Sequence, residues 1–475
     1  MMLKAANAAT RRQMPSGGST NRRHVSARTY FLNANAMNIH VDLRQVVYAL
    51  SDALDLVGVD DVSHGKRVGV MAAECAKALK LPQDEVLFLF DLGILHDIGV
   101  STTATHQHLV DEFDWAGSQA HTVIGYGLLK DFAPLARLAL PIRYHHTRWD
   151  KMLADGVPNA IAKHANLILL VDRVDAMMAP YYASGKVVQH HKAIQQEIVA
   201  RKGTYFDPEL VDVFFAISSH EAFWLLLEPK ALSGYMADMV GLGRPYEATD
   251  TDLRQLAEIF ARIVDAKSPF THTHSRGVAR VAKLLARKMG VSEDQCNKLE
   301  IAGLLHDLGK LRVPDAILDK PAKLDEDERS VMNAHSFQTM QILSNIQGFE
   351  DIRLWAASHH EAPGGLGYPY GLEAADLPQE ARILRVADIF QAMVQDRPYR
   401  KGLSQQAVCA FMTDLQNRGS IDVEVGQVLL TNLDDLFTAA RPEQPEMTTH
   451  VEVTKSVSGF GRESTGLATA QRHKS

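Results

Sequence analysis

Several features that would place this 475-residue sequence in other protein classes are absent. Its three cysteines, Cys75, Cys296 and Cys409, are too few and too irregularly spaced for a disulfide framework or a zinc–thiolate site. No stretch approaches the roughly 18 apolar residues of a membrane span, and the N-terminal region lacks the apolar core of a secretion signal. A formal net charge of −7 gives no general attraction for polynucleotides. These absences predict a cytoplasmic protein that binds neither membranes nor polynucleotides.

The hydrophobic pattern divides the chain into two helical regions between loose ends. From Met37 to about residue 440 apolar residues recur at helical spacing, with few β-branched runs, which predicts an all-α fold. The Gly/Pro break GLGRPYEATD separates the two regions, and both ends of the chain lack a helical period. The expected parts are a disordered segment over 1–36, a first domain over 37–240, a linker over 241–250, a second domain over 251–440 and a disordered tail over 441–475.

The two helical regions repeat each other. Residues 64–99 align with residues 274–309 at a constant offset without a gap, from HGKRVGV…LGILHDIG to HSRGVAR…AGLLHDLG. Each block predicts a helix with a histidine near its start, a turn, and a second helix that ends at the glycine after His-Asp. A duplication explains the alignment, so we expect the same kind of domain twice.

Histidine is the residue in excess, with 21 copies, and the repeat preserves the positions of many of them. Seven residues of metal-binding type recur in the same order in both regions: His274, His306, Asp307, His335, His359, His360 and Asp388 in the second, and His64, His96, Asp97, His121, His145, His146 and Asp172 in the first. Adjacent histidine and aspartate on one helix can serve different edges of a site, and a carboxylate can bridge two cations. The set predicts two divalent metal ions in the second domain. Its lack of thiolates favours Fe or Mn, with Zn, Ni and Mg also compatible.

Core packing is the ordinary explanation for a single histidine on an apolar helical face, and it must be weighed here. A His-Asp pair by itself is weak evidence for a metal. Core packing does not, however, require histidine or aspartate at seven corresponding positions in two halves of a chain. We therefore expect metal binding in the second domain and a second candidate metal site in the first.

The second region resembles the HD-GYP family, a subset of the HD-superfamily phosphohydrolases. The matching segments are TH (273–274), LLHDLGKLRVPDAILDKPAKL (304–324), MNAH (332–335), HHE (359–361), GLGYP (365–369), ARILRVAD (381–388) and DRPYRKGLS (396–404). The resemblance implies that the seven residues of the second region are metal ligands and that Asp307 and Lys310 are catalytic. It also implies that Lys310, Tyr368, Arg397 and Arg400 contact the phosphate and base of the substrate.

The activity implied by the resemblance is metal-dependent opening of a cyclic dinucleotide, cyclic di-GMP or 3'3'-cyclic GMP-AMP, to the linear dinucleotide and onward to mononucleotides. A helical two-domain fold and a cyclic dinucleotide partner are implied with it. Signalling proteins, or a second copy of the chain in a homodimer, are further candidate partners.

The sequence also departs from the family pattern. Residues 362–364 (APG) follow HHE where the family usually has Arg, an aromatic residue and Asp or Asn. Phe270 stands where members with a third metal carry glutamate, so two metals are expected. In the first region Val100 replaces the lysine equivalent to Lys310, and no counterpart of DRPYR follows Asp172. We therefore expect the first domain to be a structural or regulatory metal-binding module.

Two other functions are compatible with the same residues. One is an HD phosphohydrolase or nucleotidase that acts on another nucleotide, against which the GYP and RPYR segments argue. The other is a non-catalytic receptor that binds a cyclic dinucleotide or a signalling partner. Retention of Lys310 together with all seven ligand-type residues argues against that second alternative.

Overall fold

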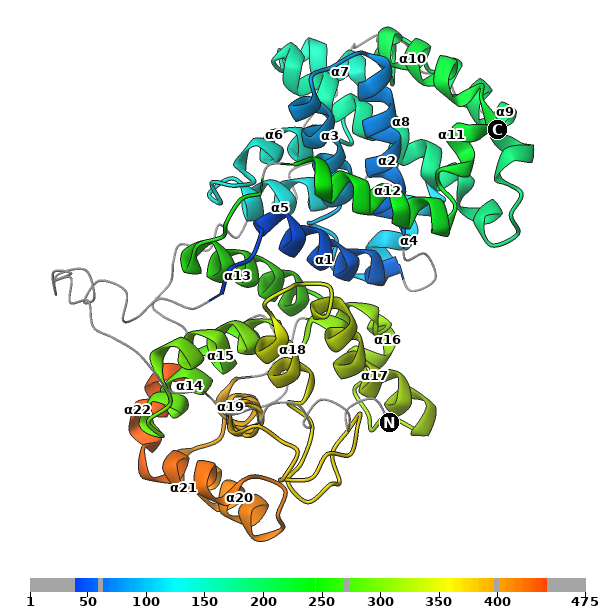
Figure 1. The fold of residues 1–475 in the computed structure, drawn as a ribbon. Coiled ribbons are helices and arrows are strands. Elements are labelled where there is room, and N and C mark those ends of the chain that lie inside the picture. The colour runs from blue at the N-terminus through cyan, green and yellow to red at the C-terminus, as the bar shows by residue number, and fades with distance from the viewer. Residues whose placement is uncertain are drawn as a thin grey trace, which may run out of the picture.

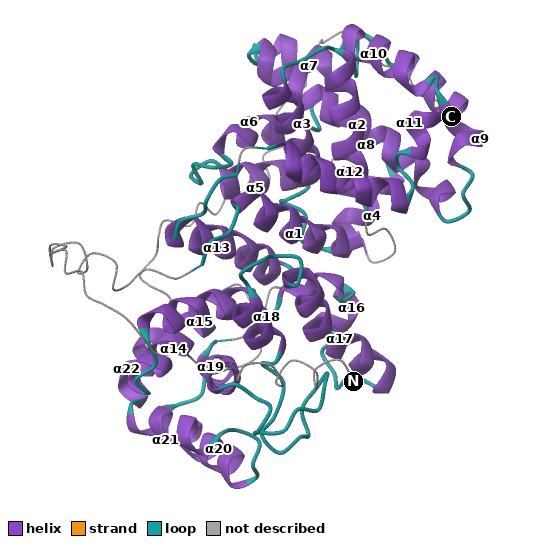
Figure 2. Ribbon diagram, in the orientation of Figure 1, coloured by secondary structure: helices purple, strands orange, loops and turns teal. Residues whose placement is uncertain are grey.

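The fold is all-α over the part of the chain that the structure describes. The computed structural model describes residues 39–58, 63–113, 115, 117–243, 245–268, 273–396 and 401–441. Within these ranges helices are joined by loops, and strand-like pairing is limited to isolated bridges (Figure 2). The predicted fold class is confirmed. The expected disordered ends lie outside these ranges, apart from Arg441.

The first half of the chain forms one helical body, blue to green in Figure 1. Helix α2 is at its centre, in contact with α3, α8, α10 and α12, while α5 and α6 pack together and α9 packs on α8. The elements are α1 (Leu43–Asp55), η2 (Leu56–Gly58), α2 (His64–Ala78), α3 (Gln83–Leu95), α4 (Thr103–Asp111), α5 (Gln119–Leu129), α6 (Ala136–Tyr144), α7 (Trp149–Ala154), α8 (Asn159–Tyr182), α9 (Val187–Val199), α10 (Pro208–Ser218), α11 (Glu221–Leu225) and α12 (Pro229–Leu242).

The second half forms another helical body, green to orange in Figure 1. Helix α14 is at its centre and packs against α15, α19 and α22, while α17 packs against η3 and α18. The elements are α13 (Asp250–Ala266), α14 (His274–Lys288), α15 (Glu293–Leu305), η3 (Leu308–Arg312), α16 (Asp315–Leu318), α17 (Glu326–Leu343), α18 (Glu350–Ala357), α19 (Gln379–Val394), α20 (Gln405–Asn417), α21 (Val423–Thr431) and α22 (Leu433–Ala440).

The central helices of the two bodies begin at equivalent histidines and bury equivalent faces. In α14 the buried stripe runs through His274, Val278, Val281 and Leu285, and in α2 through His64, Val68, Met71 and Cys75. These positions recur at helical spacing, so each histidine is carried into the interior by the apolar residues on its own helix face.

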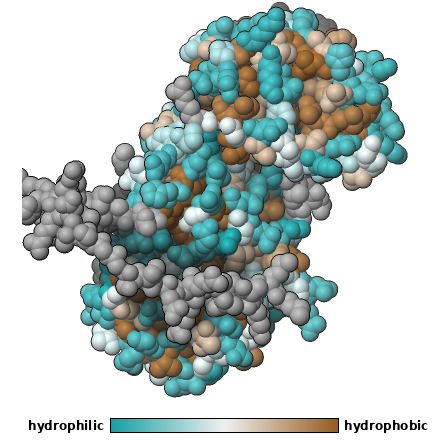
Figure 3. Space-filling model, viewed as in Figure 1, coloured by the Kyte–Doolittle hydropathy of each residue, from teal (hydrophilic) through white to brown (hydrophobic). Residues whose placement is uncertain are grey.

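On the face seen in Figure 3 the apolar residues are scattered among hydrophilic ones. None of the described helices has the combined length and apolar character needed to cross a bilayer.

The duplication extends further towards the N-terminus than the sequence alignment reaches, because α1 and α13 play the same role. Asp55 accepts a hydrogen bond from the backbone of Gly65 at 3.0 Å. Asp265 accepts one from the hydroxyl of Ser275 at 2.7 Å and from its backbone nitrogen at 3.3 Å. Each aspartate thus ties the preceding helix to the residue that follows the first histidine of its repeat.

The two bodies meet through α1 and through a buried ion pair. Helix α1 contacts α13, α17 and η3 as well as α2 and α3 of its own body (Figure 1). The fully buried Nζ of Lys267 lies 3.0 Å from Oδ1 of Asp315 and 3.3 Å from the hydroxyl of Thr103. The other carboxylate oxygen of Asp315 accepts a hydrogen bond from the backbone of Ala104 at 3.3 Å. A charge pair of the second body therefore holds the first turn of α4 in the first.

A glycine in each repeat permits a close backbone approach. A Cβ added to Gly309 would lie 2.0 Å from the carbonyl oxygen of His335, and one added to Gly99 would lie 2.0 Å from that of His121. A separation so short cannot be met without moving the backbone. Gly309 and Gly99 therefore allow the helix that carries the third histidine of each repeat to pack directly against the His-Asp turn.

Gly309→Ala is expected to lower the unfolding free energy by about 1–3 kcal/mol, because α17 must move away from the His-Asp turn. The matched control is Gly234→Ala in α12, where an added Cβ meets nothing within 4 Å. At this exposed helical position alanine should be neutral or stabilise by up to about 1 kcal/mol. Thermal unfolding of both variants checks this, and equal melting temperatures would contradict the packing argument.

Candidate metal centres

The structure brings the seven ligand-type residues of the second body into one cluster. They come from the start of α14, the end of α15, the middle of α17, the turn after α18 and the interior of α19. Two groups, each with ligand atoms within 4.8 Å of one another, make up most of it: His274, His306 and Asp388, and His335, His359 and His360. Five segments far apart in the sequence thus converge on one place, as the spacing predicted.

Asp307 lies between these two groups. Its Oδ2 is 3.2 Å from Nε2 of His306, whereas its Oδ1 is 3.6 Å from Nε2 of His335 and 3.7 Å from Nε2 of His359. One carboxylate therefore presents an oxygen to each group, which is the arrangement by which a carboxylate bridges two cations.

The buried polar atoms at this centre fit a bound cation. Oδ1 of Asp307 and Nε2 of His306 are buried, and neither has a hydrogen-bond partner within the described residues. Buried polar atoms without a partner are costly, and native proteins supply partners for nearly all of them. Two such atoms in one histidine–aspartate cluster fit a site that could hold a cation.

The histidine rings are held with one nitrogen directed at the cluster. In three of them Nδ1 bonds the carbonyl oxygen three residues earlier: His306 to Gly303 at 2.7 Å, His335 to Met332 at 2.6 Å and His359 to Ala356 at 2.7 Å. Such bonds fix the ring and its tautomer and leave Nε2 as the atom that could bind a cation. Burial also lowers the pKa of His335 to about 4 and that of His360 to about 3, so both rings are neutral near pH 7.

The edge of the cluster carries two of the predicted substrate contacts. Nζ of Lys310 is 2.6 Å from Oδ2 of Asp307. Burial alone would raise the pKa of Asp307, yet the neighbouring charges of His306 and Lys310 hold that pKa well below its usual range. The ring of Tyr368 lies with its centroid 4.7 Å from that of His360.

The loop that carries Tyr368 is anchored by Glu361, whose role sequence reasoning missed. This buried carboxylate accepts hydrogen bonds from the backbone of Tyr370 at 2.6 Å and of Leu372 at 2.9 Å. The unusual residues 362–364 are accommodated, since the backbone of Ala374 donates to the carbonyl of Pro363 at 3.0 Å. In the sequence, the one signal for this anchor is the position of Glu361 directly after the histidine pair.

The remaining predicted features of this site lie outside the described residues. They are the substrate-contacting Arg397 and Arg400, and the position of Phe270. Their roles stay predictions.

The first body holds a second cluster with the same seven residue types. Asp97, His121, His145 and His146 form one group, and His64, His96 and Asp172 form another, each with ligand atoms within 4.8 Å of one another. Nε2 of His121 lies 3.3 Å from Oδ1 of Asp97, and Nε2 of His64 lies 3.4 Å from Oδ1 of Asp172. Oδ1 of Asp97 is buried without a hydrogen-bond partner among the described residues. The cluster can therefore hold metal ions as the other can.

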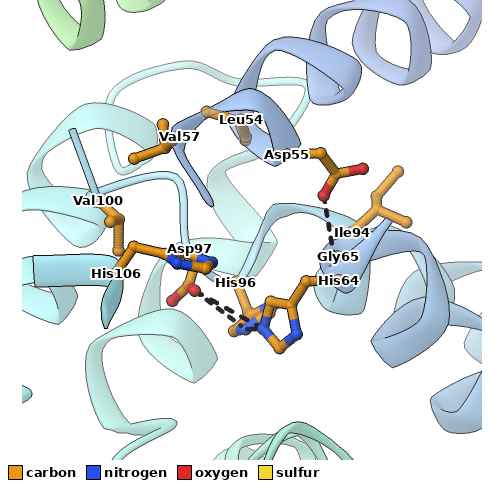
Figure 4. Close-up of a pocket in the computed structure, with 10 residues that line it drawn as sticks. All are labelled: Leu54, Asp55, Val57, His64, Gly65, Ile94, His96, Asp97, Val100 and His106. Carbon is orange, nitrogen blue, oxygen red and sulfur yellow. Dashed lines mark hydrogen bonds and ion pairs between the residues drawn. The ribbon is translucent and has the colours of Figure 1, made fainter. Parts of the chain in front are cut away.

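At the position equivalent to Lys310 the N-terminal cluster has an apolar residue, Val100. Figure 4 shows Val100 and His106 on one side of a small pocket, facing Asp97 and His64. Val100, the counterpart of Lys310, is 3% exposed. The His106 ring centroid lies 6.3 Å from that of His64. No sequence pattern points to His106, because its place depends on how α4 folds back over the cluster.

The first histidines of the two clusters, His64 and His274, have different hydrogen-bond partners. Nδ1 of His64 lies 2.8 Å from Asp175, a carboxylate that Arg67 and Tyr182 also bond, at 2.7 and 2.5 Å. Nδ1 of His274 instead lies 3.3 Å from the neutral side chain of Gln395. The position of Asp175, one helical turn after Asp172, is a signal that sequence reasoning could have used.

Comparisons with known proteins cover both bodies. The HD domain family matches residues 62–177 and, separately, residues 258–425. The chain is 34% identical to 3'3'-cGAMP-specific phosphodiesterase 1 of Vibrio cholerae over 417 residues, which is 86% of this chain and 95% of that protein. It is 28% identical to 3'3'-cGAMP-specific phosphodiesterase 3 of the same organism, over 78% of this chain and 90% of that one.

Two further relatives are also cyclic dinucleotide phosphodiesterases. The cyclic di-GMP phosphodiesterase response regulator RpfG of Xanthomonas campestris is 38% identical over 161 residues, 34% of this chain and 43% of that protein. The crystal structure of a cyclic GMP-AMP specific phosphodiesterase of V. cholerae is 26% identical, with a TM-score of 0.58, over 83% of this chain and 98% of that one. The chain has two HD domains, and it matches 3'3'-cGAMP-specific phosphodiesterase 1 over 95% of that protein's length at 34% identity. The chain therefore belongs to the HD-GYP family of phosphodiesterases.

Proposed function

We propose that the protein is a metal-dependent phosphodiesterase that opens 3'3'-cyclic GMP-AMP at its C-terminal centre. The observation that carries this proposal is the cluster around Asp307 with Lys310 and Tyr368 at its edge. The choice among cyclic dinucleotides rests on length of alignment. The relatives named for cGAMP match 86% and 78% of this chain, whereas RpfG, named for cyclic di-GMP, matches 34%.

The proposed ligands of the C-terminal centre fall into two sets that share Asp307. One set is His274, His306, Asp307 and Asp388, and the other is Asp307, His335, His359 and His360. When bound, two divalent cations supply Lewis-acid polarisation of a phosphodiester and activation of water for attack on it. The ligand types favour Fe or Mn over Zn, Ni or Mg.

The protein's own residues bind and orient the substrate. Lys310 donates a charged hydrogen bond to the phosphate that is cleaved and stabilises the negative charge that grows on its oxygens. Tyr368 stacks against a base, and Glu361 holds the loop that positions it. Arg397 and Arg400 are proposed as further phosphate contacts. The product is the linear dinucleotide, with further cleavage to mononucleotides as a second step.

We infer that the N-terminal centre binds metal ions without opening the cyclic dinucleotide. Its proposed ligands are His64, His96, Asp97, His121, His145, His146 and Asp172. Buried Val100 offers no charge for a phosphate, and the sequence has no DRPYR counterpart there. The work proposed for this centre is to stabilise the first body and thereby influence the second through their shared contacts.

Asp307→Ala is expected to abolish ring opening and to lower the metal content per chain, because this carboxylate would serve both cations. Elemental analysis and chromatography of products, with Mn or Fe supplied, measure both effects. Asp414→Ala, at a partly exposed aspartate of α20 that pairs with Arg418, is the matched control. Near-normal turnover in Asp307→Ala would contradict the binuclear assignment.

Lys310→Ala should separate the metals from the substrate chemistry. We expect the metal content to stay at the wild-type level while kcat falls about 10²–10³-fold, the usual scale for loss of one preorganised contact to the transition state. Lys288→Ala, at a surface lysine paired with Asp435, should change neither quantity. If Lys310→Ala lost its metals, Lys310 would instead have a role in assembling the centre.

Paired double substitutions test which centre opens the ring. Replacing His306 and Asp307 by alanine should remove ring opening, whereas replacing His96 and Asp97 should leave it measurable, slowed at most about 100-fold through altered contacts between the bodies. The rates are compared in full-length protein after folding is matched by circular dichroism. Residual opening in the first variant that disappears only when all four residues are changed would show that the N-terminal centre is itself an enzyme.

A further inference from the structure

Arg385 lies beside the C-terminal centre and has no role so far. It precedes Asp388 on α19 by one helical turn, so the two side chains lie on the same face of the helix. Its charge is also favoured by Asp388, Tyr368 and Glu361, which agrees with a position near both the proposed ligands and the loop that carries Tyr368. Arg385 thus borders the same site as Lys310, from the side of Tyr368.

The guanidinium of Arg385 is oriented but not neutralised. Its Nε donates a hydrogen bond of 2.8 Å to the carbonyl oxygen of Ser420. Within the described ranges Arg385 forms no ion pair, and its terminal nitrogens form no hydrogen bond. Burial lowers the pKa of Arg385 more than the nearby Asp388, Tyr368 and Glu361 raise it. A partly buried cation without a directly bonded anion is costly, and an anionic ligand on its terminal nitrogens would reduce this cost.

A neighbouring arginine on the same helix shows the contrasting arrangement. Nη1 of Arg382 lies 2.5 Å from the carboxylate of Asp422, so its charge is already paired within the protein. Arg382 therefore has no need of a ligand, although it belongs to the same helix and to the same HD-GYP segment.

The duplication provides an internal comparison. When Asp172 is aligned with Asp388, the counterpart of Arg385 in the first body is Leu169, which is 4% exposed. The counterpart of Lys310 is Val100, which is 3% exposed. At the centre proposed to take the substrate, both positions thus carry a cation. At the other centre both positions carry a buried aliphatic residue. The proposed metal-ligand types are the same at the two centres, so this comparison associates the two cations with the substrate rather than with the metals.

A cyclic dinucleotide carries two phosphates, and Lys310 and the proposed metals would occupy only the one that is cleaved. We propose that Arg385 binds the other phosphate through its two terminal nitrogens. This inference rests on the proposed function and adds a residue that selects a dinucleotide over a substrate with one phosphate. The planar guanidinium suits paired hydrogen bonds to two phosphate oxygens.

Arg385→Gln is expected to raise KM about 10- to 100-fold, the scale of lost charged hydrogen bonds, with a much smaller change in kcat and unchanged metal content. The same variant should bind a non-hydrolysable phosphorothioate cyclic dinucleotide correspondingly more weakly in calorimetry with metal-loaded protein. Arg385→Lys, which keeps the charge without the fork, should be intermediate. The matched control, Arg382→Gln, should leave KM and the dissociation constant of the probe unchanged.

The outcomes distinguish this inference from the proposed function. Failure of the wild-type protein to open any cyclic dinucleotide would overturn the proposed function. Normal opening by wild type, with KM and probe binding unaltered in Arg385→Gln, would overturn the role of Arg385 alone. A fall in kcat at constant KM would also overturn it, since the residue would then act on the cleaved phosphate. If the glutamine variant does not fold, Arg385→Met, which keeps the apolar stem, is measured in its place.

Discussion

A buried carboxylate placed between two groups of imidazoles is the constraint on which both halves of this protein depend. Asp307 and Asp97 each hold an oxygen without a hydrogen-bond partner among the described residues. Such a group is tolerable only where cationic charge surrounds it. The neighbouring histidines must therefore be held in place with Nε2 inward, and in His306, His335 and His359 this is done by the carbonyl three residues earlier. The orientation of these three rings is thus set locally, by a turn of the helix that contains or precedes each one.

The two centres show that ligands and surroundings carry separate information. Their ligand types are the same, and their helices begin at equivalent residues. At matched positions beside the proposed ligands, one centre has Lys310 and Arg385 and the other has Val100 and Leu169. The shared residue types indicate that a metal could bind at both. The difference in charge at the matched positions is the basis of the separate roles proposed for the two centres.

The all-α class and the seven-residue pattern could be read from the sequence because both depend on local spacing that the duplication displays twice. The equivalence of α1 and α13 was missed, since Asp55 and Asp265 are single polar residues on apolar stripes and acquire meaning only through Gly65 and Ser275. Glu361 and Arg385 were missed for a related reason: their partners are backbone groups of loops that the fold brings to them. The domain limits stay a prediction, because α1 contacts both bodies.

The buried pair of Lys267 and Asp315 shows how the second half of the chain depends on the first. The pair is completed by Thr103 and the backbone of Ala104, which belong to the other half of the chain. Loss of the first half would open this ammonium group to solvent and uncover the faces of α17 and η3 that α1 now protects. The first half therefore covers part of the second half, whatever its own histidine–aspartate cluster binds.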